Sequence, residues 1–314
     1  MGLTVGVDIG GTKVAAGVVD EQGKILAEAR LDTPALDADA VVATIVGAIQ
    51  TLRKQYPVEA VGLAAPGFVD EARAVVRIAP NIPGWRDRPL KADVESRTGL
   101  PAFVENDANA AAWAESKHGA GRHEETLVMV TVGTGIGGGI VIDNQLFRGR
   151  FGAGAEIGHM KVESRGRPCG CGQRGCWEQY ASGQALVREA RTKAAENRDR
   201  ARVLLSYGDG TPEGIEGLHV TQAAKQGDSV AVEAFSAVGT WLGVGLADLV
   251  AVLDPGLFVI GGGVSEAGDL LLGPARRAFL DNLSGRGFRP VADIRPAELG
   301  NDAGMVGAAD LARQ

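Results

Sequence analysis

The chain has 314 residues, of which 45% are hydrophobic and 23% charged, and its formal net charge is −7. This composition is typical of a globular protein, and the length exceeds what one hydrophobic core usually holds, so two lobes are expected. An acidic chain without long basic runs is a poor candidate for binding nucleic acid through its phosphates.

The N-terminal segment predicts a strand, a tight turn and a second strand. Residues 4–9 have a strand pattern, Gly10-Gly11 interrupt it, and residues 14–19 return as apolar sequence. Asp8 and Lys13 stand too early for a signal peptide. The patterns that follow predict a helix over 36–54, a buried strand over 60–65 ending at Pro66-Gly67, a strand over 101–106, and an alanine-rich helix from Asp107 to about Lys117.

The chain then restarts with a segment similar to its own beginning. Residues 127–132 predict a strand, and a glycine turn and a returning strand follow. Residues 7–20 align with residues 130–143 without a gap, with identities at Val7 and Val130, Gly10 and Gly133, and Asp20 and Asp143. The hypothesis is a duplicated α/β unit, with two copies facing each other across a cleft. The uncharged stretch 126–142 holds too many glycines for a membrane helix.

The second half predicts a cysteine-rich loop, several helices and one buried strand. The loop covers about 164–180, and residues 257–260 form a strand that runs into three glycines. The stretch 198–217 has the pattern of an irregular loop or a short helix. Helices are expected over about 183–197, 219–250, 268–283 and 302–312.

Three glycine-rich turns are suited to binding phosphate, because glycine leaves backbone N–H groups accessible. The first turn is Gly10-Gly11, followed by the hydroxyl of Thr12 and the ammonium group of Lys13. Asp8 precedes the turn and is well placed to hold Mg²⁺ through water. The second turn, Gly133-Thr134-Gly135, repeats the arrangement. The third, Gly261-Gly262-Gly263, follows a predicted strand and could pack under a nucleotide. The predicted nucleotide contacts are Asp8, Gly10, Gly11, Thr12, Lys13, Gly133, Thr134, Gly135, Gly261, Gly262 and Gly263.

Each turn alone is also what an ordinary hairpin uses, and only their number and duplication favour phosphate binding. Gly133, Gly135 and Gly138 have the spacing of the dinucleotide fingerprint, but that motif needs a helix directly afterwards. Residues 139–143 favour a strand instead. The sequence G-x-x-x-x-G-K-[ST] is absent from the chain, which argues against a P-loop enzyme.

Asn106 and Asp107 stand where a predicted strand ends and a helix begins. Either residue type is favoured as a helix N-cap, and that structural role is the alternative to catalysis. A helix N-terminus stabilises a carboxylate, so Asp107 is expected to be a weak base. Phosphoryl transfer tolerates a weak base, because its transition state depends more on positioning than on basicity. Asn106 could bond an adjacent hydroxyl of the acceptor.

Histidine and cysteine residues form the pattern H-x9-C-x-C-x4-C. An odd number of cysteines in so tight a cluster argues for a reducing, cytoplasmic compartment and a metal rather than disulfides. Three thiolates and one imidazole complete a tetrahedral Zn²⁺ shell, so the site is expected to be structural. The predicted ligands are His159, Cys169, Cys171 and Cys176, and Glu156 and Glu178 flank them as candidates for bonding sugar hydroxyls. His159 could bind zinc through one ring nitrogen and sugar through the other.

These residues, in this order, resemble the ROK family (repressors, open reading frames, sugar kinases), and within it the bacterial glucokinases. The segments that carry the resemblance are VDIGGTK (7–13), APGFVD (65–70), NIPGW (81–85), ENDANAAAWAE (105–115), GTGIGGGIV (133–141), EIGH (156–159), CGCGQRGCWEQYASG (169–183) and VIGGGVS (259–265). They reach nearly from end to end, and EIGH together with CGCGxxGCxE is far more specific than any glycine turn.

The resemblance implies an actin-like, ribonuclease-H-like α/β fold with ATP and Mg²⁺ in the cleft. It implies a small lobe over 1–116 joined by a C-terminal helix over 300–314, and a large lobe over 117–299 with the zinc loop. It implies dimers or dimers of dimers. Asp107 would be the base toward the sugar 6-hydroxyl. The implied sugar contacts are Gly67, Asn81, Asn106, Glu156, His159 and Glu178, and the implied zinc ligands are His159, Cys169, Cys171 and Cys176.

Several alternatives stay open at this stage. The acceptor could be another hexose or an N-acyl hexosamine, such as mannose, fructose, allose, N-acetylglucosamine or N-acetylmannosamine. Polyphosphate could be the donor, although no basic cluster is evident. A sugar-responsive repressor needs a DNA-binding segment of roughly 60–80 residues ahead of the kinase-like part, and the first strand already begins at Thr4. A zinc-ribbon module needs no second phosphate turn, and the net charge disfavours nucleic acid.

Overall fold

The computed structural model describes residues 2–314, which divide into two compact units. Unit 1 consists of the N-terminal residues up to Met129, Gly138–Ala155 and Ala297–Gln314. Unit 2 consists of Val130–Gly137 and Glu156–Pro296. The lobe boundaries expected from the resemblance, after residues 116 and 299, stay a prediction.

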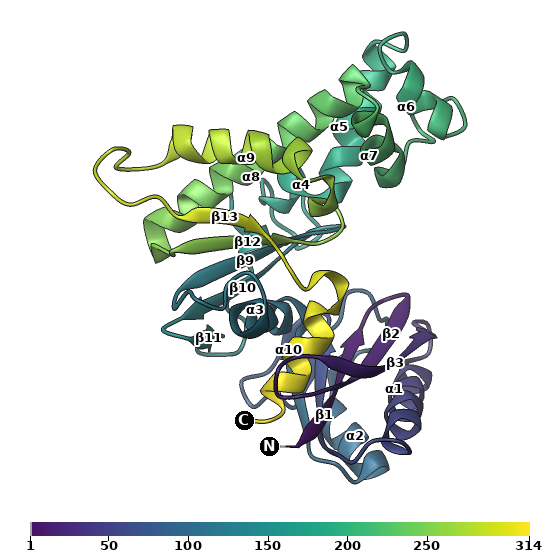
Figure 1. Cartoon of the computed structure of the whole chain (residues 1–314). Helices are drawn as coiled ribbons and strands as arrows, with labels where there is room; N and C mark the ends of the chain where they lie inside the picture. The colour runs from purple at the N-terminus through teal and green to yellow at the C-terminus, as the bar shows by residue number, and fades with distance from the viewer. Residues whose placement is uncertain (1) are drawn as a thin grey trace. The chain divides into compact units, whose positions relative to one another are not determined.

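A sheet with the strand order β3-β2-β1-β4-β8 forms the centre of unit 1 (Figure 1). Its strands are β1 (Leu3–Ile9), β2 (Lys13–Val19), β3 (Ile25–Asp32), β4 (Val58–Ala65) and β8 (Ala102–Asn106). β1 and β2 form the predicted antiparallel hairpin, whereas β1, β4 and β8 are parallel neighbours. The carboxyl ends of these three parallel strands therefore lie at the same end of the sheet.

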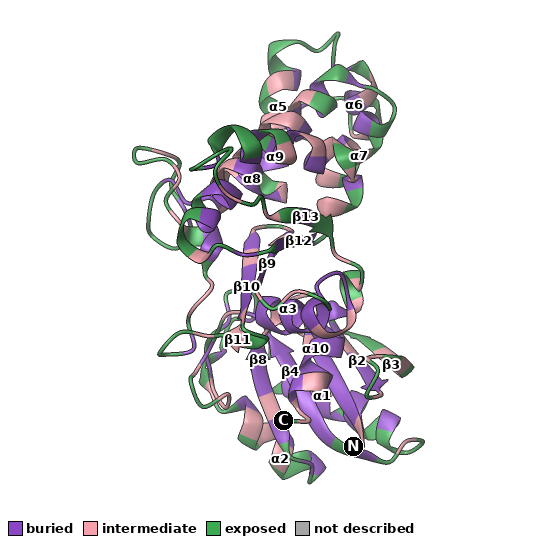
Figure 2. Cartoon of the chain, turned by 60° about the vertical axis from the view of Figure 1, so that its left-hand side comes forward, coloured by how far each residue is buried: buried purple, intermediate pink, exposed green. Residues whose placement is uncertain are grey.

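The helices of unit 1 cover both faces of this sheet. They are α1 (Ala38–Arg53), α2 (Leu90–Thr98), α3 (Asp107–His118) and α10 (Ala303–Leu311). Alternation along β1 separates the faces: Val7 belongs to the buried apolar cluster that includes Ile45 of α1. Thr4 faces the other way, and its hydroxyl donates to the Ala309 carbonyl of α10 at 2.8 Å. α3 packs against α10, and Figure 2 shows that β4 and β8 are largely buried.

Helix α10 approaches β1 and β4 so closely that only glycine fits beneath it. A Cβ on Gly62 would lie 1.8 Å from the Ala308 carbonyl oxygen, and a Cβ on Gly6 would lie 1.9 Å from the Met305 carbonyl oxygen. Because a backbone carbonyl cannot rotate away as a side chain can, Gly62→Ala must displace α10 from the sheet. We expect this substitution to lower the free energy of unfolding by roughly 1–3 kcal/mol, measured by urea denaturation.

Gly47→Ala is the matched control for that substitution. Gly47 lies within α1, and an added Cβ there meets nothing within 4 Å. Alanine favours a helix interior over glycine, so this variant should be as stable as the wild type or more stable. Equal unfolding free energies for Gly62→Ala and the wild type would contradict the close-packing argument.

The second sheet repeats the strand order of the first. Its order is β11-β10-β9-β12-β13, so β9, β10, β11, β12 and β13 take the places of β1, β2, β3, β4 and β8. The strands are β9 (Leu127–Val132), β10 (Ile136–Ile142), β11 (Gln145–Phe147), β12 (Leu257–Gly261) and β13 (Asp293–Pro296). This topology confirms the repeat predicted from the sequence. The unit boundaries after Met129 and Gly137 fall inside β9 and β10.

The helical part of unit 2 differs from the prediction at one place. Its helices are α4 (Glu178–Ala181), α5 (Gly183–Glu196), α6 (Arg202–Tyr207), α7 (Gly217–Lys225), α8 (Ser229–Leu253) and α9 (Asp269–Asn282). The single helix predicted over 219–250 is wrong, because α7 and α8 are separate. Gly227 has a φ of 83°, which stops α7, and the Asp228 carboxylate accepts from Val230 N and Ala231 N at 3.0 Å and caps α8.

Helix α8 packs along α9 (Figure 1). By length and composition alone it could span a membrane, with a mean hydropathy of 1.7 over its most apolar window. Half of that window is buried inside the structure, as in the core helix of a globular domain. This single feature is weak evidence for a membrane segment.

The sequence patterns did not predict several short elements. They are β3, α2, β11, β13 and a small antiparallel sheet of β5 (Phe68–Val69), β6 (Val76–Ile78) and β7 (Arg86–Arg88). In β3 every side chain is exposed or partly exposed, so the strand carries no apolar alternation strong enough to recognise. Pairing with β2 forms this strand, and that pairing is a tertiary contact.

Candidate active site and metal centre

The first predicted phosphate turn joins β1 to β2 in unit 1. Gly10 N donates to the Lys13 carbonyl at 2.8 Å, and the Thr33 hydroxyl donates to the Gly10 carbonyl at 2.8 Å. The side chains of Thr12 and Lys13 are exposed. A Cβ on Gly11 would lie 3.2 Å from Asn81 Cβ, so the turn and Asn81 are neighbours. The turn thus presents a hydroxyl and an ammonium group to solvent, as phosphate binding requires.

Asp8 lies near the end of β1, opposite Ala15 of β2, and faces the start of α10. Burial, and to a smaller extent the charge of Asp107, raise the pKa of its carboxyl to about 7, although the charge of Arg30 partly opposes this shift. The Asp8 and Asp107 carboxyl groups therefore lie close enough that the negative charge of Asp107 makes ionisation of Asp8 less favourable. Such a pair is a suitable place for a divalent cation, whose charge would favour both carboxylates.

This shift predicts a measurable dependence of stability on pH. The pKa of Asp8 rises from its ordinary value of 3.8 to about 7, so its stabilising contribution is complete below about pH 4 and is lost as pH rises through 7. Without Mg²⁺ and nucleotide, we expect the wild type to lose up to about 4 kcal/mol between pH 4 and pH 8 relative to Asp8→Asn. Urea unfolding of both proteins measures this, and parallel pH curves would contradict it.

Asn106 and Asp107 lie at the junction of β8 and α3. Asn106 provides the N-cap, since its Oδ1 accepts from Asn109 N at 3.0 Å, and its Nδ2 donates to the Gly67 carbonyl at 3.0 Å. Asp107 is the first residue of the helix, and its Oδ1 accepts from Ala108 N at 2.9 Å. The capping role therefore belongs to Asn106, and Asp107 is available for another one.

The expectation that the helix N-terminus makes Asp107 a weak base is wrong. Burial raises the pKa of its carboxyl, although the hydrogen bonds from the Ala108 and Asp107 backbone and from Asn106 lower it. The cost of removing the charge from water exceeds the stabilisation by the helix end. A raised pKa makes this aspartate a stronger base than an exposed one.

Unit 1 thus gathers a set of the predicted residues at the carboxyl ends of β1, β4 and β8. Gly67 follows β4 with a φ of 87°, and a Cβ there would lie 2.0 Å from the Ile78 carbonyl oxygen. Asn106 bonds to Gly67, Asn81 lies against Gly11, and the charges of Asp8 and Asp107 interact. In open α/β sheets, ligands bind at this end of the strands.

The second predicted phosphate turn lies in unit 2, next to the start of α5. Gly133 N donates to the Gly135 carbonyl at 3.0 Å, and Gly183 N donates to the Gly133 carbonyl at 2.8 Å. Gly262 has a φ of 83°, and a Cβ there would lie 2.6 Å from the Val132 carbonyl oxygen. The second turn and the third turn therefore meet at the amino end of one helix.

A cavity of about 1140 Å³ opens beside these turns within unit 2. Of the predicted residues, Gly133, Thr134 and Gly263 line it, whereas Gly261 belongs to β12 and Gly135 faces the Glu178 carboxylate. The sequence patterns did not predict its other walls, most of which come from α5 and α7, with Val264 and Glu266 beside Gly263. They include Gln184, Arg188, Arg191, Leu218, Gln222 and Lys225. No local signal marks these residues, because they meet only when the two helices pack together.

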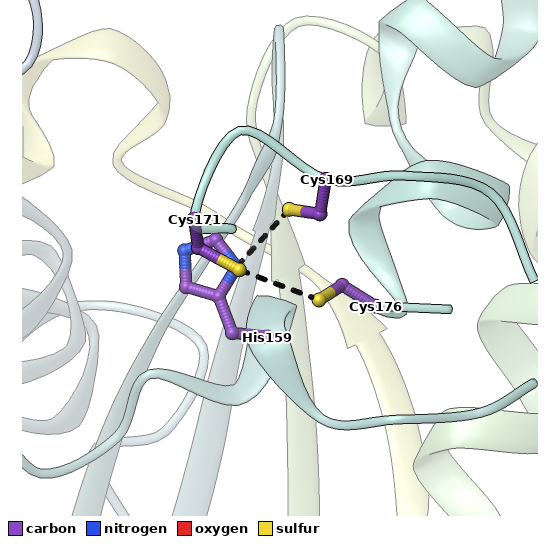
Figure 3. Close-up of side chains that lie close together, drawn as sticks. All are labelled: His159, Cys169, Cys171 and Cys176. Atoms are coloured by element: carbon purple, nitrogen blue, oxygen red, sulfur yellow. Dashed lines mark hydrogen bonds between the residues drawn. The ribbon is translucent and has the colours of Figure 1, made fainter. Parts of the chain in front are cut away.

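The four predicted zinc ligands converge in unit 2 (Figure 3). Cys171 Sγ lies 3.6 Å from Cys176 Sγ, Cys169 Sγ lies 3.7 Å from His159 Nδ1, and all four donor atoms lie within 4.8 Å of one another. Tetrahedral Zn²⁺ with bonds of about 2.3 Å to sulfur keeps its sulfurs about 3.8 Å apart. The donor set and its spacing therefore fit zinc.

The loop that carries the cysteines depends on glycine. Gly175 has a φ of 78°, and a Cβ there would lie 1.7 Å from the Glu163 carbonyl oxygen. The bridge between Lys161 and Cys176 aligns the two arms of the loop. Glycine at this point allows the close approach that brings Cys176 to the cluster.

Glu178 lies against the metal centre. Cys169 Sγ donates to its Oε1 at 2.9 Å, and His159 Nδ1 lies 3.8 Å from the same atom. Burial and this hydrogen bond raise the pKa of the Cys169 thiol to about 12. His159 directs Nδ1 toward the cluster, so its Nε2 lies on the opposite side of an exposed ring (Figure 3). Glu156 is exposed and directly precedes the short helical turn that carries His159.

Known proteins resemble the whole chain. Glucokinase of Streptomyces coelicolor is 54% identical over 314 residues, which are 100% of this chain and 98% of the relative. A crystal structure of a ROK family glucokinase from Streptomyces griseus, in complex with glucose and AMPPNP, shares 54% identity, covers 100% of both chains and gives a TM-score of 0.91. The ROK hexokinase of Thermus thermophilus shares 37% identity, covers 99% of this chain and 98% of its own, and gives a TM-score of 0.81.

These likenesses confirm the predicted actin-like, ribonuclease-H-like fold. The two sheets with equivalent strand order are the duplicated part of that fold. The ROK family model matches residues 4–314. This chain therefore belongs to the ROK family.

Proposed function

We propose that the protein is a glucokinase that transfers the γ-phosphoryl group of ATP to the 6-hydroxyl of glucose. The observation that carries this function is the full-length, 54% identical likeness to a glucokinase solved with glucose and AMPPNP. The two glycine hairpins, the paired carboxyl groups of Asp8 and Asp107, and the cavity beside Gly133 support it independently. In phosphoryl transfer the protein supplies mainly position and charge, and these groups are suited to both.

On the donor side, the cavity of unit 2 is the proposed nucleotide site, with the phosphates near Gly133 and Thr134. Gly133 and Thr134 of that cavity and the exposed Thr12 and Lys13 of unit 1 carry the groups that phosphate needs. Asp8 would hold Mg²⁺ through water. The raised pKa of Asp8 supports this role, because a cation would remove the cost of ionising the buried carboxyl.

On the acceptor side, Asp107 is the proposed base that accepts the proton of the 6-hydroxyl. Asn81, Asn106 and the backbone near Gly67 are the proposed sugar contacts in unit 1. In unit 2, Glu156, Glu178 and Nε2 of His159 have the same role. The exposure of the His159 side chain and the contact of its Nδ1 with Cys169 Sγ support that assignment.

Zinc is the proposed occupant of the metal centre, held by His159, Cys169, Cys171 and Cys176. Four protein ligands complete its shell, so its role is to brace the loop rather than to activate water. We further propose a cytoplasmic homodimer or tetramer that binds neither membrane nor nucleic acid. Zinc thiolates are compatible with a reducing compartment.

An enzyme-coupled assay with ATP and a panel of sugars tests the function. Glucose should give the highest kcat/KM among glucose, mannose, fructose, allose, N-acetylmannosamine and N-acetylglucosamine. The same panel with polyphosphate tests the donor, because Arg188, Arg191 and Lys225 place cations in the cavity wall. Turnover with an N-acyl hexosamine alone would reassign the acceptor, and no turnover with any sugar would contradict the kinase proposal.

A further inference from the structure

Glu105 is a fully buried carboxylate that lies two residues before Asp107. Arg148 Nε donates to its Oε1 at 3.1 Å and lies 2.8 Å from Oε2, and Arg73 Nε lies 3.2 Å from Oε2. The contacts at Oε2 are ionic, without the geometry of a hydrogen bond. We call Glu105, Arg148 and Arg73 the Glu105 cluster. A buried charge needs partners of this kind to remain ionised.

The carboxylate of Glu105 also holds the residues on either side of Asp107. Its Oε1 accepts from Asn106 N at 2.9 Å and from Asn109 Nδ2 at 3.1 Å. Asn106 and Asn109 are themselves joined by the helix cap, since Asn106 Oδ1 accepts from Asn109 N at 3.0 Å. The Glu105 side chain therefore hydrogen-bonds residues on both sides of Asp107 at the start of α3.

Arg148 connects this carboxylate to a second segment of unit 1. Its Nη1 donates to the Glu71 carbonyl at 3.1 Å and its Nη2 to the Asp70 carbonyl at 2.9 Å, while its side chain is only 9% exposed. It directly follows β11, and the chain runs from there to Glu156 and the metal loop. Each of the three guanidinium nitrogens of Arg148 thus donates to a group of unit 1.

We propose that the Glu105 cluster is a positioning device that sets Asn106 and Asp107 in the geometry required for phosphoryl transfer. This proposal rests on the proposed function, in which Asp107 is the base. Glu105 and Arg148 act through their neighbours and do not touch the acceptor themselves. A displacement of a reacting group by about 1 Å costs on the order of 100-fold in rate, so loss of the cluster affects kcat.

Arg148→Met and Glu105→Gln test the proposal, with Arg150→Met as the matched control. Arg150 lies in the same segment, is 72% exposed, and pairs with Glu71 at the surface. We expect Arg148→Met and Glu105→Gln to lower kcat for glucose phosphorylation about 10–100-fold and to leave the KM for ATP within about twofold. Arg150→Met should behave as the wild type, and Arg148→Lys should restore part of the kcat. Each rate is divided by the fraction of protein that binds AMPPNP.

A double-mutant cycle with Asp107→Asn separates positioning from general structural damage. If the cluster acts through Asp107, Arg148→Met should change the residual rate of Asp107→Asn by less than about twofold. An equal loss in both backgrounds, or a wild-type kcat for both cluster variants, would overturn the proposal. If Glu105→Gln does not fold, Arg148→Met and Arg148→Lys carry the test. Near-normal turnover by Asp107→Asn alone would instead remove the base assignment, and the positioning proposal with it.

Discussion

Asp107→Asn should reduce kcat for glucose phosphorylation by roughly 100- to 10,000-fold, the range found when a general base is removed. The amide keeps the shape of the side chain and loses the ability to accept a proton. Because burial raises the pKa of Asp107, its ionised form is costly to the folded protein. The variant should therefore be at least as stable as the wild type at pH 8, and glucose binding should persist. Steady-state kinetics, calorimetry with glucose and urea unfolding measure these three quantities.

Asp269→Asn is the matched control for that experiment. Asp269 is also the first residue of its helix, α9, but its side chain is 90% exposed and pairs with Arg276 at 3.2 Å. The same change of charge at the same helical position should leave kcat unchanged. If both variants lost a comparable share of kcat, the cause would be the removal of charge at a helix end rather than the loss of a base. Full activity of Asp107→Asn would exclude Asp107 as the base.

Loss of zinc should release the loop that carries Glu178 and raise the KM for glucose at least about tenfold. Structural zinc sites bind with apparent free energies of about 10–16 kcal/mol, so the purified protein should keep about one zinc per chain. Cys171→Ser removes one ligand at the most exposed cysteine, where substitution creates no cavity in the core. Elemental analysis should find little zinc in this variant after dialysis, while AMPPNP binding is retained because the cavity walls lie on α5 and α7.

Gln173→Ala is the control within the same loop. Its side chain is exposed, and its backbone makes its contacts in the loop: the carbonyl accepts from Cys169 N at 2.8 Å, and the backbone also hydrogen-bonds the Cys171 sulfur. This variant should keep its zinc and its KM for glucose. If the wild-type protein contains no metal as purified, and its KM for glucose does not change when zinc is added, a structural zinc would be contradicted.

Residues close together in the sequence were recognisable from local patterns. The β1–β2 hairpin, its repeat in β9–β10 and the cluster of Cys169, Cys171 and Cys176 each depend on neighbours within a few positions. Glycine, cysteine and alternating apolar residues have strong local preferences, so the type of each element and the candidate ligand of each turn could be predicted directly. The boundary between α7 and α8 was missed, although Gly227 and Asp228 carry the local signals for it.

The amino-acid sequence alone predicted the repeated hairpins and four candidate zinc ligands, because residue type and short spacing indicate each of them. The candidate base came from the family resemblance, since a helix cap explained the residues at 106 and 107 equally well. Only the tertiary structure decided the raised pKa of Asp107, the walls of the cavity on α5 and α7, and the pairing of Glu105 with Arg148. These features depend on burial and on contacts between residues far apart in the chain. Desolvation is a property of everything that surrounds a group in space, and local sequence does not record it.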